Sequence, residues 1–234
     1  MESPSLHEGR ILKRYKRFLA DVELPSGEVV VAHVPNTGSM KTCWGEGWKV
    51  WLSHSPNPSR KLPWTLELTS PGAALIMVNT GNANKLAHEA LKNGDIEKLA
   101  GYSEVIPEQK IHDSRFDFFL KGHATEPDCW VEVKNVTLLE TGVHATFPDS
   151  VSERGRKHLK DLIRVKKEGQ RAAMLYVVSR SDAASFGPAA HIDPAYAETL
   201  NEAYRAGVEI HCHQVKFQAG HWQLAHALPV MGLS

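Results

Sequence analysis

The sequence lacks several features that would assign a protein quickly to a class. It has only three cysteines in 234 residues, Cys43, Cys129 and Cys212, with no C-x-x-C pair. This argues against a disulfide framework and against a zinc site built from cysteines. The longest apolar run, 172–178, falls far short of the roughly 18 to 20 residues that a membrane helix needs. The first twenty residues are rich in charge and do not have the layout of a secretory signal. We therefore expect a soluble, cytoplasmic protein that does not enter a membrane.

Net charge is also lacking, because Lys plus Arg and Asp plus Glu both number 27. The overall charge therefore indicates no partner. No G-x-G-x-x-G, P-loop or G-x-S-x-G motif is present, which leaves no support for a nucleotide-dependent enzyme or a serine hydrolase. Hydrophobic residues make up 42% and charged residues 23%, as in ordinary globular proteins. The length allows one or two domains.

The first 80 residues have the pattern of short strands separated by Gly, Pro and Asn. Alternating apolar positions predict strands at 11–23, 29–34, 48–53, 64–68 and 73–78, with a turn at Pro25-Ser26-Gly27. Five short strands in such a segment predict a small barrel of the OB-fold type. We place a domain boundary after residue 80, where the pattern changes.

From residue 81 to residue 234, helical and strand patterns alternate. Helices are predicted at 82–92, 152–168 and 194–205, and strands at 104–111, 115–120, 129–134, 172–178, 208–215 and 222–225. This alternation predicts an α/β domain in which helices flank a sheet. The three consecutive strands between 104 and 134 are expected to form an antiparallel meander at one side of it.

One group of charged side chains falls on the predicted strands of the second domain. Asp117 lies in the strand at 115–120, and Glu132 and Lys134 lie in the strand at 129–134. Side chains two positions apart on a strand point to the same face, so Glu132 and Lys134 project together. If the two strands pair, two carboxylates and an ammonium converge.

Such a group suits a divalent cation. Neighbouring carboxylates repel each other unless a cation neutralises them, and hard oxygen ligands suit Mg²⁺ or Mn²⁺. We predict that Asp117 and Glu132 hold the metal ion, with Glu89 on the preceding helix as a further candidate ligand. Lys134 would orient the attacking water and offset the negative charge that develops during phosphodiester hydrolysis.

The E-x-K tripeptide alone is a weak signal, because the sequence holds a second copy at Glu108–Lys110. Only the copy at Glu132 lies in an apolar strand with an aspartate upstream. An ordinary ion pair on an edge strand accounts for the same residues equally well. The pattern leaves both interpretations open.

Two basic runs favour a polyanionic partner. Residues 10–17 interleave Arg and Lys with an aromatic side chain, a combination that pairs with phosphates and stacks on bases. The helix at 152–168 carries seven basic and three acidic side chains. The turn after residue 34 offers amides and hydroxyls that can contact phosphate. We expect a nucleic acid, DNA or RNA, as the partner, and the following contact residues: Arg14, Tyr15, Lys16, Arg17, Asn36, Thr37, Arg154 and Lys157.

Several longer stretches resemble one known family, sugar fermentation stimulation protein A. They are, in order, Arg14–Val22, Pro35–Met40, Ser114–Phe118, Glu132–Lys134, and Phe147–Asp149 followed by Glu153–Gly155. The resemblance covers essentially the whole chain. It implies an OB-fold-like nucleic-acid-binding domain over 1–80. Over 81–234 it implies a restriction-endonuclease-like α/β domain with a mixed sheet, of the PD-(D/E)xK superfamily, in which Asp117, Glu132 and Lys134 occupy the signature positions.

The resemblance also implies non-specific DNA binding and a regulatory link to sugar metabolism, particularly that of maltose. One residue departs from the superfamily pattern, since Phe116 and not proline precedes Asp117. The later Pro148-Asp149 is no substitute, because it follows the E-x-K. Three functions stay open: a Mg²⁺- or Mn²⁺-dependent nuclease, a catalytically silent DNA-binding regulator of maltose metabolism, and an enzyme of sugar metabolism. The sequence does not indicate the oligomeric state.

Overall fold

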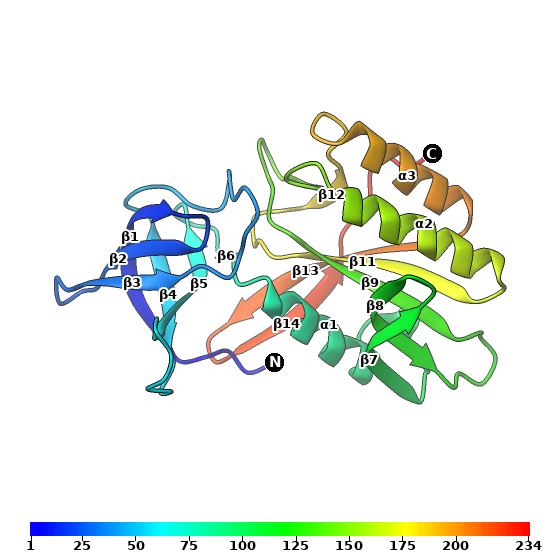
Figure 1. Ribbon diagram of the computed structural model, residues 1–234, viewed down its shortest axis with the longest axis horizontal. Helices are drawn as coiled ribbons and strands as arrows, with labels where there is room; N and C mark the ends of the chain where they lie inside the picture. The colour runs from blue at the N-terminus through cyan, green and yellow to red at the C-terminus, as the bar shows by residue number, and fades with distance from the viewer.

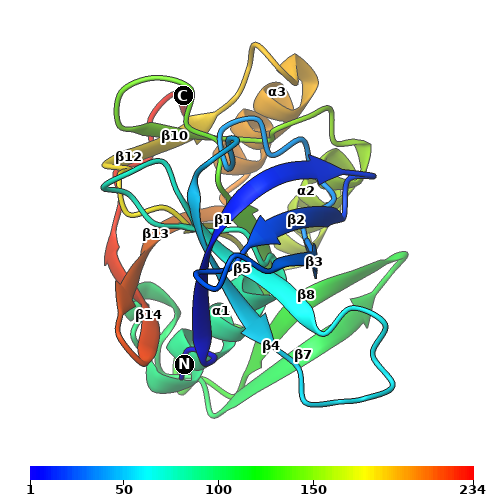
Figure 2. The same ribbon diagram turned by 90° about the vertical axis from the view of Figure 1, so that its left-hand side faces the viewer.

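The computed structural model describes residues 1–234, which form a barrel and an α/β sheet lying side by side (Figure 1). The barrel strands are β1 (Leu6–Tyr15), β2 (Leu19–Glu23), β3 (Val29–His33), β4 (Lys49–His54), β5 (Trp64–Ser70) and the short β6 (Ile76–Met77). They pair in the order β3-β2-β1-β4-β5-β6, and a parallel pairing of β3 with β5 closes the barrel (Figure 2). The predicted OB-type barrel is confirmed.

The strand expected over 11–23 is in fact two strands. The chain reverses at 16–18, so that Tyr15 pairs with Leu19 across a tight turn. Lys16 and Arg17 adopt positive φ angles of 48° and 66° there. Non-glycine residues seldom adopt this left-handed conformation. No Gly, Pro or Asn marks the turn, so the pattern of apolar residues runs through it unbroken.

The second half begins with a helix and continues with strands and helices in turn. Its elements are α1 (Gly81–Asn93), the 3₁₀ turn η1 (Glu97–Leu99), β7 (Glu104–Ile111), β8 (Ser114–Lys121), β9 (Cys129–Val136), β10 (His144–Phe147), α2 (Glu153–Lys167), β11 (Arg171–Val178), β12 (Ser185–Pro188), α3 (Pro194–Arg205), β13 (Glu209–Gln218) and β14 (His221–Ala227). Every predicted element is present. Sequence analysis missed β10 and β12, a pair of four-residue parallel strands too short to show a period.

The main sheet has the order β14-β13-β11-β9-β8-β7. Its centre, β9, β11 and β13, is parallel, whereas β7, β8 and β14 pair antiparallel at the two sides. The meander β7-β8-β9 and the mixed α/β sheet are therefore confirmed. Parallel strands buried on both faces require near-continuous apolar sequence, and β11 supplies it, being almost fully buried along its length.

Helices cover the two faces of this sheet (Figure 1). On one face, α1 packs Leu86, Ala87 and Ala90 against the sheet in a cluster of 20 buried residues. On the other face, α2 and α3 contribute to a second cluster of 19 buried residues. The helix ends follow local chemistry: Ser152 accepts a hydrogen bond from the amide of Gly155 and so caps α2. None of the helices is long and apolar enough to cross a membrane.

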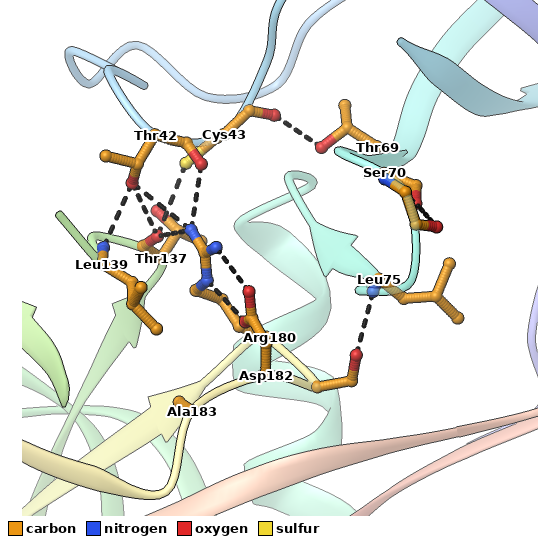
Figure 3. A network of polar contacts seen from close by, with 12 residues as sticks. Thr42, Cys43, Thr69, Ser70, Leu75, Thr137, Leu139, Arg180, Asp182 and Ala183 are labelled. Carbon is orange, nitrogen blue, oxygen red and sulfur yellow. Dashed lines mark hydrogen bonds and ion pairs between the residues drawn. The ribbon is translucent and has the colours of Figure 1, made fainter. Parts of the chain in front are cut away.

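A buried arginine joins the barrel to the sheet (Figure 3). The guanidinium of Arg180, which follows β11 and is 3% exposed, donates from Nη1 to the carbonyl oxygens of Thr42 and Thr137, both at 2.9 Å. Its Nε and Nη2 donate to the two carboxylate oxygens of Asp182. The hydroxyl of Thr42 also accepts from the amide of Leu139. One side chain thus connects a barrel loop to the ends of two sheet strands.

A buried glutamate makes a second joint. Glu67 on β5 is 4% exposed, and its carboxylate accepts hydrogen bonds from the hydroxyl of Ser53 and from the side-chain amides of Asn79 and Asn82. Asn82 lies in the first turn of α1. This joint therefore sets the position of α1, and of Asn84 two residues later, relative to the barrel.

Candidate active site

The strands β8 and β9 part at Asp117. Their pairing runs from Leu120 opposite Cys129 to Phe118 opposite Val131 and goes no further. The next position of β8 is Asp117, and its Oδ2 accepts a hydrogen bond from the backbone amide of Val133 at 2.8 Å. A side chain thus takes over where the backbone pairing ends. This places the Asp117 carboxylate directly beside Glu132 on β9.

Asp117 is half-buried, and it is held from a second side by α1. The side-chain amide of Asn84 donates to its Oδ1 at 2.7 Å. Burial, together with the nearby charge of Glu132, raises the pKa of Asp117 to about 6, although the hydrogen bonds from Val133 and Asn84 oppose the change. A carboxyl group whose pKa is shifted towards neutrality by burial and a like charge is typical of a functional site.

Glu132 lies deeper, with 3% of its surface exposed. Its Oε1 accepts hydrogen bonds from Nζ of Lys134, at 2.5 Å, and from Nδ1 of His158 on α2. Burial alone would raise the pKa of Glu132, but the hydrogen bonds and charges of His158 and Lys134 outweigh it and leave the pKa below its usual value. Glu132 is therefore ionised at neutral pH. Its other oxygen, Oε2, is buried and has no hydrogen-bond partner.

This arrangement fits one hydrated divalent cation. An ionised oxygen buried without a partner is unfavourable, and a cation bound to Oε2 would remove that penalty. Asp117 supplies a second hard oxygen ligand next to it. No group of three or more His, Cys, Asp and Glu side chains is arranged to hold a metal. Two carboxylates are enough for Mg²⁺, which keeps several of its waters and binds substrate phosphates.

The structure does not bring Glu89 to this site, so the expected third carboxylate is absent. Glu89 lies on α1 five residues after Asn84, which places it about 140° further around the helix. Its carboxylate contacts the N-terminal ammonium of Met1 at 2.7 Å. That ammonium also donates to the carbonyl oxygen of Trp222 on β14. Asn84 is the α1 residue that faces the site.

Sequence analysis also missed His158. The residue lies on the buried stripe of α2 with Leu159 and Leu162, and it is 5% exposed. An imidazole on an otherwise apolar stripe is the signal that could have indicated a buried polar partner. The partner itself could not be named, because the contact joins residues 26 positions apart on different elements.

The second E-x-K copy is placed quite differently. Glu108 is exposed on β7 and forms an ion pair with Arg115, Oε2 to Nε, at 2.7 Å. No aspartate side chain contacts it. The two copies differ in burial and in partners, which the tripeptide alone does not reveal.

The residues of the basic hairpin β1-β2 that are expected to contact nucleic acid are of two kinds, exposed and internally bonded. Lys16 and Arg17 are exposed at its tip, and their side chains form no ion pair. Arg14 points inward, and its Nη2 donates to the carbonyl oxygens of Arg17, Asn36 and Gly38. Arg14 therefore organises two barrel loops. The hydroxyl of Tyr15 donates to Asp21 at 2.8 Å, which fixes that ring at the surface.

The loop after β3 and the helix α2 hold the other expected contacts. Thr37 is exposed, whereas Asn36 is 7% exposed and accepts from the amide of Gly38. On α2, Arg154 is exposed without an ion-pair partner. Lys157 is exposed too, but its ammonium already contacts Asp161 and Ser114, both at 2.7 Å. It is less free to meet a phosphate than its position suggests.

Comparison with known proteins agrees with both halves of this fold. The family described as "SfsA N-terminal OB domain" matches residues 12–78, and "Sugar fermentation stimulation protein RE domain" matches residues 81–221. A sugar fermentation stimulation protein homolog from Marinomonas sp. is 48% identical over 97% of this chain and 88% of its own length. One from Shewanella sp. strain ANA-3 is also 48% identical, over 97% of this chain and 98% of its own length.

A solved structure is similar as well. "The structure of Pyrococcus Furiosus SfsA in complex with Ca2+" aligns with a TM-score of 0.87 and 26% identity, over 98% of this chain and 97% of that one. Barrel, sheet and chain order are thus shared along the whole length. The chain belongs to the sugar fermentation stimulation protein family, SfsA.

Proposed function

We propose that this protein binds DNA with little sequence preference and hydrolyses phosphodiester bonds with the help of Mg²⁺ or Mn²⁺. The observation that carries the proposal is the placing of Asp117, Glu132 and Lys134 at the point where β8 and β9 part. Buried Oε2 of Glu132 and the raised pKa of Asp117 support a cation between the two carboxylates. RNA is the alternative substrate.

The residues divide the work in the following way. Asp117 and Glu132 would hold the metal ion, which when bound activates water and stabilises charge on the phosphate. Lys134 carries the only ammonium in contact with Glu132 and is 16% exposed, so it can turn towards a phosphate oxygen or the attacking water. Asn84, His158 and the amide of Val133 keep the two carboxylates in place.

The solved structure of a relative supports a divalent metal ion at this site. The Pyrococcus furiosus SfsA structure is that of a complex with Ca²⁺. Ca²⁺ and Mg²⁺ both take oxygen ligands, and carboxylates are common to their sites. A divalent cation in this family fits the donor set of Asp117 and Glu132.

Surface charge supports a nucleic-acid partner. Lys16 and Arg17 are exposed at the tip of the first hairpin, and Arg154 and Lys160 are exposed on α2, all without ion-pair partners. Cations on flexible side chains neutralise phosphates without distinguishing bases. The barrel loop at Thr42 contacts the residue that follows β9, and His158 of α2 contacts Glu132 in the middle of β9, so the barrel and α2 both adjoin the strand that carries Glu132 and Lys134.

A digest of single- and double-stranded DNA and RNA, with EDTA or with Mg²⁺ or Mn²⁺, tests the proposal. We expect cleavage only when metal is present. In Asp117→Asn, Glu132→Gln and Lys134→Met the cleavage rate should fall by at least about a hundredfold. DNA affinity in EDTA should be unchanged or higher in the two carboxylate variants, because negative charge is removed. The matched control is Glu108→Gln with Lys110→Met in the second E-x-K. Wild-type cleavage by Glu132→Gln would disprove the site.

A second candidate function is a DNA-binding regulator of sugar metabolism without catalysis. One observation favours it: Lys134 already neutralises Glu132, and no third metal-ligating side chain is present. An ion pair of this kind can stabilise the buried carboxylate without a metal. If the protein binds DNA but cleaves none of the substrates with any metal in the digest, the result would favour this candidate.

A further inference from the structure

A polar pocket of about 230 Å³ lies where the barrel meets the sheet. Four separate parts of the chain line it: the barrel loop at Asn36–Gly38, Thr80 at the start of α1, the end of β9 with Asn135 and Thr137, and the segment from Thr146 to Asp149. Pockets for drug-sized ligands start at roughly 300 Å³. This pocket therefore has room for one small group, not for a duplex.

Several polar groups around the pocket have no partner within the protein. The hydroxyl of Thr146 is buried and makes no hydrogen bond. Asn36 is 7% exposed, and its Oδ1 accepts from the amide of Gly38 while its Nδ2 donates to no protein group. By contrast, Oδ1 of Asn135 is satisfied, because it accepts from the hydroxyl of Ser179. Because buried polar groups are nearly always satisfied, the unpartnered hydroxyl of Thr146, in a pocket that also holds the unpartnered amide nitrogen of Asn36, indicates a polar ligand.

The chemistry of the lining narrows the ligand class. No Lys or Arg lines the pocket, and the one charged residue, Asp149, is an acceptor, so a phosphate would be repelled. Oδ2 of Asp149 accepts from the amide and hydroxyl of Ser39, which leaves Oδ1 free. Amide donors, hydroxyls and a carboxylate acceptor match a neutral group that carries donors and acceptors along one edge. Leu138 and Phe147 provide its apolar side.

The pocket also adjoins the candidate active site. Asn135 directly follows Lys134 on β9, so its side chain lies on the opposite face of the strand, the face that α1 covers. Thr80, at the start of α1, lines the pocket four residues before Asn84. Because Asn84 bonds to Asp117, the pocket lies about one helical turn along α1 from the candidate metal ligands, within reach of the next base of a polynucleotide whose phosphate binds there.

We propose that the pocket binds one unstacked nucleobase of the substrate strand, through Asn36, Asp149 and Thr146. This inference rests on the proposed nucleic-acid function and deepens it. A base inside a duplex cannot reach such a pocket, so the substrate is single-stranded there or its base is turned out of the stack. The protein should therefore prefer unpaired or distorted nucleic acid to a regular duplex.

Binding to two oligonucleotides tests the proposal. One is a single-stranded octanucleotide, and the other has the same sugar-phosphate backbone with every base removed; both are titrated into the full chain in EDTA. We expect the base-containing strand to bind at least about tenfold more tightly. In Asn36→Asp and Thr146→Val this ratio should fall to about twofold or less. Using the ratio cancels the effect of the charge that Asn36→Asp adds, because both strands carry the same phosphates.

The variants are chosen to keep the fold. Asn36→Asp keeps the Oδ1 acceptor for Gly38, and Thr146→Val removes a hydroxyl that has no partner, so its Tm should be unchanged or higher. A stable variant that loses the base preference separates a binding role from a structural one. The control is Asn57→Asp: Asn57 makes the same kind of turn, with Ser59, on an exposed loop outside the pocket. Its ratio should equal that of the wild type.

Three results would overturn the proposal in different ways. Equal affinity for the two strands, or an unchanged ratio in both variants, removes the base pocket and leaves the nucleic-acid function standing. No binding of either strand at low salt removes the nucleic-acid function and the pocket with it. A thermal shift with maltose or glucose that Thr146→Val abolishes, without one from nucleosides, would show that the pocket binds a sugar.

Discussion

Nδ1 of His158 forms a hydrogen bond with Oε1 of Glu132, and both side chains are buried. The contact ties α2 to β9 beneath the candidate metal ligands. Against the effect of burial, it is the strongest of the interactions that hold the pKa of Glu132 below its usual value, ahead of the charge of Lys134. His158 is thus a positioning residue for a carboxylate that has to stay charged.

Replacing His158 by leucine should raise the pKa of Glu132, because burial is then opposed by Lys134 alone. The acidic limb of the pH profile of cleavage should move to higher pH, and the Mg²⁺ requirement should increase. His158→Asn, whose amide nitrogen can occupy the place of Nδ1, should recover most of the wild-type profile. The measurement is the cleavage rate against pH at several Mg²⁺ concentrations. Identical profiles for the leucine variant and the wild type would contradict the assignment.

Asp117→Asn should stabilise the protein at neutral pH. The pKa of Asp117 is raised from 3.8 to about 6, so above pH 6 the folded state holds a charge that the unfolded state accommodates more easily. The penalty is at most about 3 kcal/mol, since one pKa unit corresponds to about 1.4 kcal/mol. It is present in full above pH 6 and vanishes below pH 3.8, where both states are protonated.

The gain from Asp117→Asn should therefore shrink as the pH falls from 6 towards 4. Urea unfolding of variant and wild type at several pH values, without metal, measures it. Asp113→Asn, an exposed aspartate on the same hairpin, is the control and should change stability little at any pH. A gain that does not depend on pH would mean that the charge of Asp117 is not its cause.

Arg17 and Arg14 should differ in what their loss affects. Arg17 is exposed, and its alanine variant should lower the affinity for DNA and reduce the slope of log K against log salt by about 0.9, the value for one phosphate contact. Arg14→Met should lower the free energy of unfolding by about 1 to 3 kcal/mol, since three carbonyl oxygens lose a donor. Salt titrations and urea unfolding of both variants distinguish the roles. An unchanged salt slope in Arg17→Ala would exclude a phosphate contact there.

Arg180→Lys should loosen the joint between barrel and sheet. A lysine cannot donate to Thr42, Thr137 and both oxygens of Asp182 at once, so some of these acceptors lose their donor. We expect the free energy of unfolding to fall by about 1 to 3 kcal/mol for each buried acceptor left without a partner. We expect faster proteolysis around residues 78–80, which connect β6 of the barrel to α1. Arg164→Lys changes an exposed pair with Glu168, which solvent screens, and should leave stability almost unchanged. Equal protease resistance in Arg180→Lys and wild type would show that the joint is held elsewhere.

Local signals account for the parts of the fold that sequence analysis predicted well. The bounds of α3, 194–205, follow from Asp193 and Pro194 at its start and Gly207 after its end, all of which act within a few residues. The turn at 16–18 was not predictable in this way, because it is held by the guanidinium of Arg14 and by loop carbonyls from residues 36 and 38.

For the candidate site, the period of a strand places Glu132 and Lys134 on one face, and the aspartate upstream is visible in the sequence. The position of Glu89 on α1 is visible too, but its direction depends on how α1 is rotated against the sheet. That rotation is set by the apolar side chains of α1 that pack on the sheet, and by Asn82, which bonds to Glu67 of the barrel. Asn84 faces the site as a result.

The amino-acid sequence by itself determined the order and type of the longer elements, the small barrel, the α/β alternation of the second half, and the three residues that define the candidate site. These depend on periodicity and on the chemistry of near neighbours along the chain. Only the tertiary structure decided which side chains hold those residues, how the barrel is fixed to the sheet, and that a polar pocket opens at the end of β9. Those features arise from contacts between segments distant in sequence, whose meeting depends on the packing of whole helices and sheets.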